Sequence, residues 1–200
     1  MSTIDANGML IDPKVILRRS SGIEHGALPS VLAIVVHQTD SGTAESSLNG
    51  YQVGGNGAHF LIDKNGQIYQ TASVFARCYH VGKLIKSKCL AINKSSCDTG
   101  AMAKMLAMSW VNQINAIDAH ERAKPYPDRY PVNSDSIGIE LVGMHIDDKT
   151  YEAVTAAQNS SLQWLIEELY AQFNLKAEDV YRHPTVSYKN PGEASSAIWK

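Results

Sequence analysis

The chain has 200 residues, of which 44% are hydrophobic, enough for one domain with a buried core. Its 18 basic and 20 acidic side chains give a formal net charge of −2, which excludes an overall positive field for binding nucleic acid or an anionic membrane. The longest apolar stretch, residues 27–36, is far shorter than the about 20 residues of a membrane span. We therefore expect a soluble protein with a local functional site.

The first 30 residues show no sustained periodicity, and we expect an arm packed on a domain that spans residues 31–200. Residues 31–37 are mostly β-branched without polar alternation, which predicts a strand buried on both faces and ending in His37. The polar residues 38–57 indicate a loop with at most one weak helical turn.

A hairpin is predicted next, because residues 58–63 and 67–71 flank an Asn-Gly pair that favours the positive φ of a tight turn. Periodicity then predicts a helix over 101–122, a strand over 136–142 and a helix over 151–173. This order is typical of an α/β fold in which helices pack on a mixed sheet.

The three cysteines, Cys78, Cys89 and Cys97, form no CxxC pair. Cys89 and Cys97 flank a short polar segment that could close as a disulfide in an oxidising compartment, and reduced thiols are the alternative. The N-terminus has neither a basic region nor an apolar one, so no ordinary secretory signal is expected and export would need another route.

Histidines are the most promising reactive residues. His37, His59 and His80 lie at or near predicted strand ends, and His183 follows far along the chain beside a proline. Any one of them taken singly is more often a hydrogen-bonded structural residue. Two histidines and a carboxylate together can hold a catalytic zinc ion with a fourth position open to water, and the lack of HExxH excludes a helix-borne zinc site of that kind.

Five short segments make a more specific signal. They are residues 34–39 (IVVHQT), 58–70 (AHFLIDKNGQIYQ), 79–82 (YHVG), 133–143 (NSDSIGIELVG), and His183 with Lys189 and residues 190–192 (NPG). In this order they resemble the motifs of the type 2 N-acetylmuramoyl-L-alanine amidases, which include phage lysozyme-type amidases and peptidoglycan recognition proteins. The resemblance covers residues 31–193. It implies a peptidoglycan-recognition-protein-like amidase fold, in which helices flank a central mixed β-sheet.

The resemblance also implies an activity, because that family uses zinc to cleave the amide between the lactyl group of N-acetylmuramic acid and L-alanine. His37 and His183 match its zinc histidines, and Glu140 matches the glutamate taken to activate the hydrolytic water. Asn190 stands where the family carries Asp or Cys, and it is a poor zinc ligand. We therefore expect Glu193, ten residues after His183, to be the third ligand, with Asn190 as the alternative.

Three further residues match the family less directly. Lys189 matches a lysine that stabilises the oxyanion, with an exposed surface lysine as the alternative. His80 matches a histidine lining the cleft, and we assign it and His59 to substrate binding, with a structural or supporting role as the alternative. Ala58 replaces a tyrosine that assists catalysis in phage and animal members, which places more of the chemistry on Glu140.

Residues 83–133 form a longer connection than is usual in the family, so we predict an insertion that shapes substrate access. Its methionines with Trp110 form either a helix docked on the core or a binding face. Tyr126 and Tyr130 in its proline-rich loop are candidates for stacking on sugar rings.

The sequence thus predicts a zinc-dependent amidase of peptidoglycan or muropeptides, acting as a lytic antibacterial effector or an endolysin. Such a protein would reach the periplasm through a secretion system or phage lysis, and an effector would have a cognate immunity protein as partner. The alternatives are a muropeptide-binding module without catalysis and a cytoplasmic enzyme of cell-wall recycling.

Overall fold

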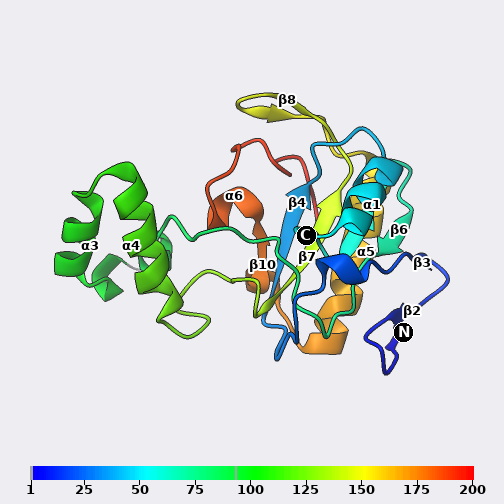
Figure 1. Cartoon of the computed structure of the whole chain (residues 1–200), viewed down its shortest axis with the longest axis horizontal. Helices are drawn as coiled ribbons and strands as arrows, with labels where there is room; N and C mark the ends of the chain where they lie inside the picture. Colours follow the sequence, from blue (N-terminus) through cyan, green and yellow to red (C-terminus); the bar gives the residue numbers. More distant parts are fainter. Residues whose placement is uncertain (1, 93) are drawn as a thin grey trace.

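A computed structural model describes residues 2–92 and 94–200, and a six-stranded mixed sheet forms the centre of this part of the chain (Figure 1). The strand order is β10-β4-β7-β5-β6-β3, in which only β5 and β6 are antiparallel neighbours. The strands are β3 (Val15–Leu17), β4 (Ala33–Gln38), β5 (Phe60–Ile62), β6 (Ile68–Gln70), β7 (Ser136–Leu141) and β10 (Val180–Arg182). Helices flank this sheet, so the predicted fold class is confirmed.

The two central strands, β4 and β7, present one apolar and one functional face. Ile34 and Val36 of β4 and Ile137 and Ile139 of β7 lie in the main hydrophobic core. Because side chains alternate along a strand, the neighbouring positions, including His37 and Glu140, point to the other face of the sheet. The same alternation places two polar side chains at the ends of strands that are otherwise buried.

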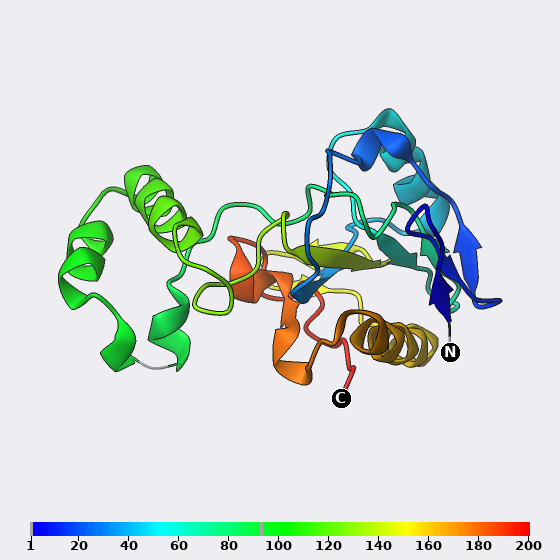
Figure 2. The ribbon, with the colours of Figure 1, turned by 90° about the horizontal axis from the view of Figure 1, so that it is seen from below.

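Helix α5 (Ala156–Phe173) covers the apolar face, and Figure 2 shows it below the sheet. Leu162, Leu165, Ile166 and Leu169 join the main core from this helix. A capping box between Thr155 and Gln158 fixes its first turn. The helix begins later than predicted because the preceding residues form the exposed hairpin of β8 (His145–Asp147) and β9 (Thr150–Tyr151).

The opposite face carries α1 (Ala44–Val53), where the sequence predicted a loop with a weak turn. The Thr43 side chain accepts a hydrogen bond from the Ser46 amide at 3.3 Å and starts the helix. Only Ala44, Leu48 and Tyr51 of this helix are buried, so its hydrophobic periodicity is too faint to identify it as a helix.

The N-terminal 30 residues contribute an edge strand, because β3 pairs in parallel with β6. The predicted hairpin is confirmed, with β5 and β6 antiparallel and Gly66 in its turn at φ 87°. The remaining small elements are β1 (Thr3–Ile4), β2 (Leu10–Ile11), η1 (Ser21–Ile23), η3 (Ala177–Asp179) and α6 (His183–Val186). A search of the described helices finds none with the length and hydropathy of a bilayer-spanning segment.

Residues 83–133 form what we term the helical lobe, whose helices stand apart from the sheet in both views (Figures 1 and 2). Its elements are α2 (Lys88–Ile92), η2 (Lys94–Ser96), α3 (Thr99–Leu106) and α4 (Trp110–Arg122). The single helix predicted over 101–122 is therefore wrong. The chain breaks after α3 and folds back, because only then can Met102 and Met105 pack against Ile117.

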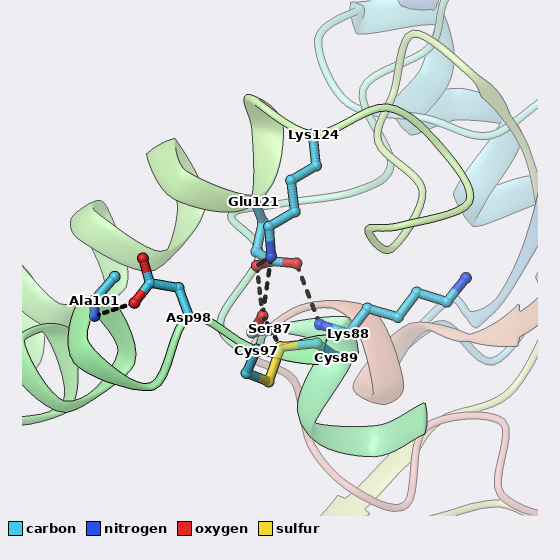
Figure 3. The surroundings of a disulfide bond; sticks show 8 residues. All are labelled: Ser87, Lys88, Cys89, Cys97, Asp98, Ala101, Glu121 and Lys124. Atoms are coloured by element: carbon cyan, nitrogen blue, oxygen red, sulfur yellow. Dashed lines mark hydrogen bonds and ion pairs between the residues drawn. A yellow bond between two sulfur atoms is a disulfide. The ribbon is translucent and has the colours of Figure 1, made fainter. Parts of the chain in front are cut away.

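Two features hold the base of the helical lobe (Figure 3). Cys89 and Cys97 form a disulfide, which decides between the two alternatives left by the sequence. Glu121 is fully buried and accepts hydrogen bonds from Ser87 Oγ at 2.6 Å, the Lys88 amide at 3.2 Å and Lys124 Nζ at 2.5 Å. Three donors compensate the carboxylate for its lost hydration.

Lys88 joins the helical lobe to the sheet. Its ammonium donates a hydrogen bond to the Tyr181 hydroxyl at 2.8 Å and lies over the rings of Tyr126 and Tyr130, at 4.9 Å and 5.9 Å from their centroids. These two tyrosines were candidates for sugar stacking. Tyr130 is 5% exposed beside this buried lysine, so sugar stacking on it is corrected, whereas Tyr126 is half-buried and its stacking on a sugar stays a prediction.

Candidate metal centre and active site

The parallel pairing of β10 with β4 brings two distant histidines to one edge of the sheet. His37 lies near the end of β4, and His183 directly follows β10 as the first residue of α6. The loop that carries Glu193 is fastened to β4, because the Ala194 amide donates to the Gln38 side chain at 3.1 Å. Three segments of the chain therefore meet at this edge.

His37, His183 and Glu193 form a compact cluster of potential metal ligands. The two Nδ1 atoms are 2.8 Å apart, and Glu193 Oε1 lies 3.0 Å from His183 Nδ1 and 3.5 Å from His37 Nδ1. These separations bracket the about 3.3 Å between two ligands that sit at about 2.0 Å from a tetrahedral zinc ion. All three side chains are buried, so the donor set fits a zinc ion with an open fourth position.

A hydrogen-bonded chain fixes the tautomer of His37. His80 Nε2 lies 3.2 Å from the Ser136 carbonyl oxygen, which can only accept, so this nitrogen carries the proton. His80 Nδ1 must then accept from His37 Nε2, at 3.1 Å. The lone pair of His37 Nδ1 is left facing His183 and Glu193, the arrangement that a metal-binding imidazole needs.

His80 itself is held by close packing on β7. A Cβ atom at Gly138 would lie 2.8 Å from the His80 ring, so the glycine of the Ser-Ile-Gly-Ile-Glu segment makes room for it. At the other end of this polar cluster, the buried His183 Nε2 has no hydrogen-bond partner among the described residues.

The protonation states suit metal binding. Burial and the nearby His183 lower the pKa of His37 to about 4. Burial alone would raise the pKa of Glu193, but the neighbouring imidazoles of His183 and His37 lower it to about 2. At neutral pH the cluster therefore holds a neutral His37 imidazole and a carboxylate, the forms in which these groups ligate metals.

The structure places Glu193, and not Asn190, beside the histidines. Asn190 Nδ2 donates to the Asp147 carbonyl at 2.8 Å, and its Oδ1 accepts from the Gly192 amide at 2.8 Å. Because both polar atoms of this side chain serve the loop and the β8–β9 hairpin, Asn190 supports the loop from which Glu193 reaches the cluster.

Glu140 lies beside the cluster, opposite His37 in the parallel pairing of β4 with β7. Loss of hydration and the negative charge of Glu193 raise the pKa of Glu140 to about 7. A carboxyl group with a pKa near the working pH can both accept and return a proton.

A cleft of about 400 Å³ opens over these residues. Its lining residues are His37, Gln38, Thr39, Asp40, Tyr51, Asn56, Gly57, Tyr79, His80, Val81, Gly82, Glu140, Tyr151, His183, Lys189 and Glu193. Lys189 is exposed at the rim, where its positive charge adds to the lowering of the His37 pKa and offsets a small part of the rise in the Glu140 pKa. The cleft has the size of a ligand site.

The two histidines assigned to substrate binding differ in position. His80 lines the cleft from behind His37. His59 is fully buried and outside the cleft lining, with Nδ1 accepting from the Gly138 amide at 3.0 Å and Nε2 facing the Ala76 carbonyl at 2.9 Å. His59 is therefore placed to support β7, the alternative role considered for it, and has no contact with the cleft.

Sequence reasoning missed Tyr51. Its buried hydroxyl has no hydrogen-bond partner among the described residues, and it lies in the cleft lining near Glu140. Burial and the charge of Glu140 raise the pKa of this hydroxyl well above its usual value. The Thr43 cap and the spacing of Ala44, Leu48 and Tyr51 were the available signals for the helix that positions it.

The mixed sheet carries at one edge a cluster of side chains that could hold a metal ion, next to a cleft. Comparison with known families is more specific. A model of the N-acetylmuramoyl-L-alanine amidase family (Amidase_2) matches residues 27–194, and the chain belongs to this family. The predicted family is thus confirmed, and membership supports an amidase that acts on peptidoglycan. A comparison with curated protein sequences found no match.

Solved structures with a similar fold include three amidase-family proteins. A Se-Met AmpD derivative is 20% identical over 96% of both chains, with a TM-score of 0.55. The amidase LysC from Clostridium intestinale URNW is 18% identical over 89% of this chain and 87% of its own, with a TM-score of 0.52. AmpDh3 from Pseudomonas aeruginosa, in complex with anhydromuramic pentapeptide, is 17% identical over 93% of this chain and 58% of its own, with a TM-score of 0.51. At these identities the likeness shows the fold alone.

Proposed function

We propose that this protein is a zinc-dependent N-acetylmuramoyl-L-alanine amidase that hydrolyses the amide between the lactyl group of muramic acid and L-alanine. The observation that carries the proposal is the convergence of His37, His183 and Glu193 at the floor of an open cleft, with Glu140 beside them. Three protein ligands with a free fourth position are typical of catalytic zinc sites.

In this proposal His37, His183 and Glu193 hold the ion, which when bound lowers the pKa of water to about 7 and polarises a carbonyl group. Glu140 accepts the proton of the attacking water and donates it to the nitrogen of the leaving alanine, a shuttle that suits its pKa of about 7. Lys189, at the rim, stabilises the negative charge that develops on the substrate's carbonyl oxygen.

The test combines metal analysis with product analysis. Purified protein is expected to contain one equivalent of zinc and to release free stem peptides from sacculi. His37→Ala should lose both, whereas His120→Ala, on α4 and outside the cleft, should match the unmodified protein. A protein that binds muropeptides without zinc or products would be a binding module, and the hydrolase proposal would be wrong.

We further propose that the protein acts on the cell wall outside the cytoplasm, as a lytic effector or an endolysin. The Cys89–Cys97 disulfide supports this setting, because such bonds persist in oxidising compartments. An effector would be matched by an immunity protein in the producing cell. Expression directed to the periplasm should lyse bacteria, and cytoplasmic expression should not. Growth unharmed in both cases would contradict the proposal and favour a recycling enzyme.

A further inference from the structure

Two exposed aromatic side chains lie beside the cleft without contributing to its lining. Trp110 is 54% exposed and Tyr188 is 67% exposed, and their rings meet edge to face with centroids 5.4 Å apart. Trp110 opens α4 in the helical lobe, whereas Tyr188 directly precedes Lys189 of the cleft rim. The pair therefore joins the lobe to the edge of the candidate active site.

Polar contacts anchor the C-terminal half of α4 to the cleft wall. Asp118 accepts a hydrogen bond from the Leu84 amide at 2.8 Å, and Arg122 donates one to the Gly82 carbonyl at 3.2 Å. Gly82 lines the cleft, and Leu84 forms a β-bridge with Ser187, next to Tyr188. Tyr188 thus follows a residue that is bridged to the cleft wall, and Trp110 reaches this wall through its ring contact with Tyr188.

The chemistry of the proposed substrate places sugar rings near this pair. Only three covalent bonds separate the carbonyl carbon of the lactyl amide from the pyranose ring of muramic acid, so the sugar must lie at the cleft when the amide is at the metal centre. In a polymer the neighbouring sugars continue along the rim. Pyranose rings present a flat face of C–H groups, which packs on aromatic rings, and exposed aromatic clusters commonly mark binding sites.

We propose that Trp110 and Tyr188 form a glycan subsite, which stacks on a sugar of the strand next to the muramic residue whose amide is cleaved. The subsite makes polymeric peptidoglycan a better substrate than soluble muropeptides. This inference rests on the proposed function of the cleft. The stem peptide is attached to the nitrogen of the same amide, and it is the other part of the substrate that could contact Trp110 and Tyr188.

The first experiment measures sugar binding without any peptide or hydrolysis. Calorimetry with the β-1,4-linked hexasaccharide of N-acetylglucosamine should show binding that Trp110→Ala weakens about tenfold. Trp110→Phe should keep most of the affinity because the ring is retained. Val111→Ala, a 66% exposed neighbour on the same helix, is the matched control and should bind like the unmodified protein. No detectable binding at millimolar hexasaccharide, or equal binding by Trp110→Ala, would overturn the subsite.

The second experiment compares two substrates. Trp110→Ala should lower kcat/KM for sacculi about tenfold and leave kcat/KM for a monomeric muropeptide unchanged, and Tyr188→Ala should act in the same direction. An equal loss on both substrates would assign the pair to the stem peptide and overturn the glycan proposal. If the unmodified protein hydrolyses neither substrate, the proposed function fails. Hexasaccharide binding that depends on Trp110 would still support the subsite.

Discussion

The sheet that carries the candidate site and the helical lobe beside it are held together by different interactions. All six residues of β4 are buried, and α5 covers the apolar face of the sheet with a continuous core. The helices α3 and α4 of the lobe share a far smaller core, in which Met102, Met105 and Ile117 are the buried members, while Leu106 is 52% exposed. Hydrophobic burial alone stabilises so small a unit poorly.

Covalent and polar contacts take over in the helical lobe. The Cys89–Cys97 disulfide, the hydrogen bonds to buried Glu121 and the tyrosines around Lys88 hold its base. This difference in stabilising interactions indicates that the sheet and the lobe have different structural requirements. Catalytic atoms require the fixed geometry of a densely packed sheet, whereas an attached lobe can present a surface to a large substrate without disturbing them.

The largest effect is expected from a change confined to the sheet. Glu140→Gln keeps the size of the side chain and removes its proton-accepting oxygen, so kcat should fall about 10²- to 10⁴-fold. Zinc content and thermal unfolding should stay close to those of the unmodified protein. Glu178→Gln, an exposed residue of η3, serves as the control. Turnover at the original rate in Glu140→Gln would remove this residue from the mechanism.

A smaller effect is expected where the sheet positions a ligand. His80→Ala removes the acceptor for His37 Nε2, and zinc affinity should fall about 10- to 100-fold, measured by competition with a chelator. His80→Asn restores an acceptor oxygen near the position of Nδ1 and should recover part of the loss. Equal zinc affinity in all three proteins would show that the hydrogen-bonded chain does not matter for the metal.

The smallest effect on catalysis is expected from the helical lobe. Replacing Cys89 and Cys97 by serine frees a loop with a sequence separation of 8, which should destabilise the lobe by about 2.5 kcal/mol. Amide hydrogen exchange should speed up in α3 and α4 and not in β4 or β7. Turnover of a monomeric muropeptide should not change. Faster exchange in β4 to the same extent would mean that the lobe and the sheet unfold together and are not stabilised separately.

The sequence predicted those elements whose signal is local. The Asn-Gly turn and the strong periodicity of α5 are examples, because a turn type and an amphipathic face each depend on nearby residues. The break between α3 and α4 was missed, since the pattern of apolar residues runs through it and the fold-back is set by packing against Ile117. Tertiary contact overrode the periodicity there.

The candidate site also contains residues that local motifs indicate and residues that depend on contacts between distant parts of the chain. Short motifs pointed to His37, His183 and Glu140, but the choice between Glu193 and Asn190 depended on a loop held by the distant β8–β9 hairpin through Asp147. A contact of this kind between residues far apart in the chain leaves no local pattern. The hydrogen-bonded chain through His80 is another such feature, because it exists only once β4 and β7 are paired.

His37 and Glu140 are paired on neighbouring parallel strands, so the backbone hydrogen bonds between β4 and β7 set the distance between these two residues. A slip of one strand by one residue in this register would turn one of the two side chains into the apolar core and leave the other at the cleft, because side-chain direction alternates along a strand. The proposed metal ligand and the proposed proton acceptor therefore face the cleft together only in this register. If the proposed mechanism holds, a molecule that opens at this strand pair is inactive.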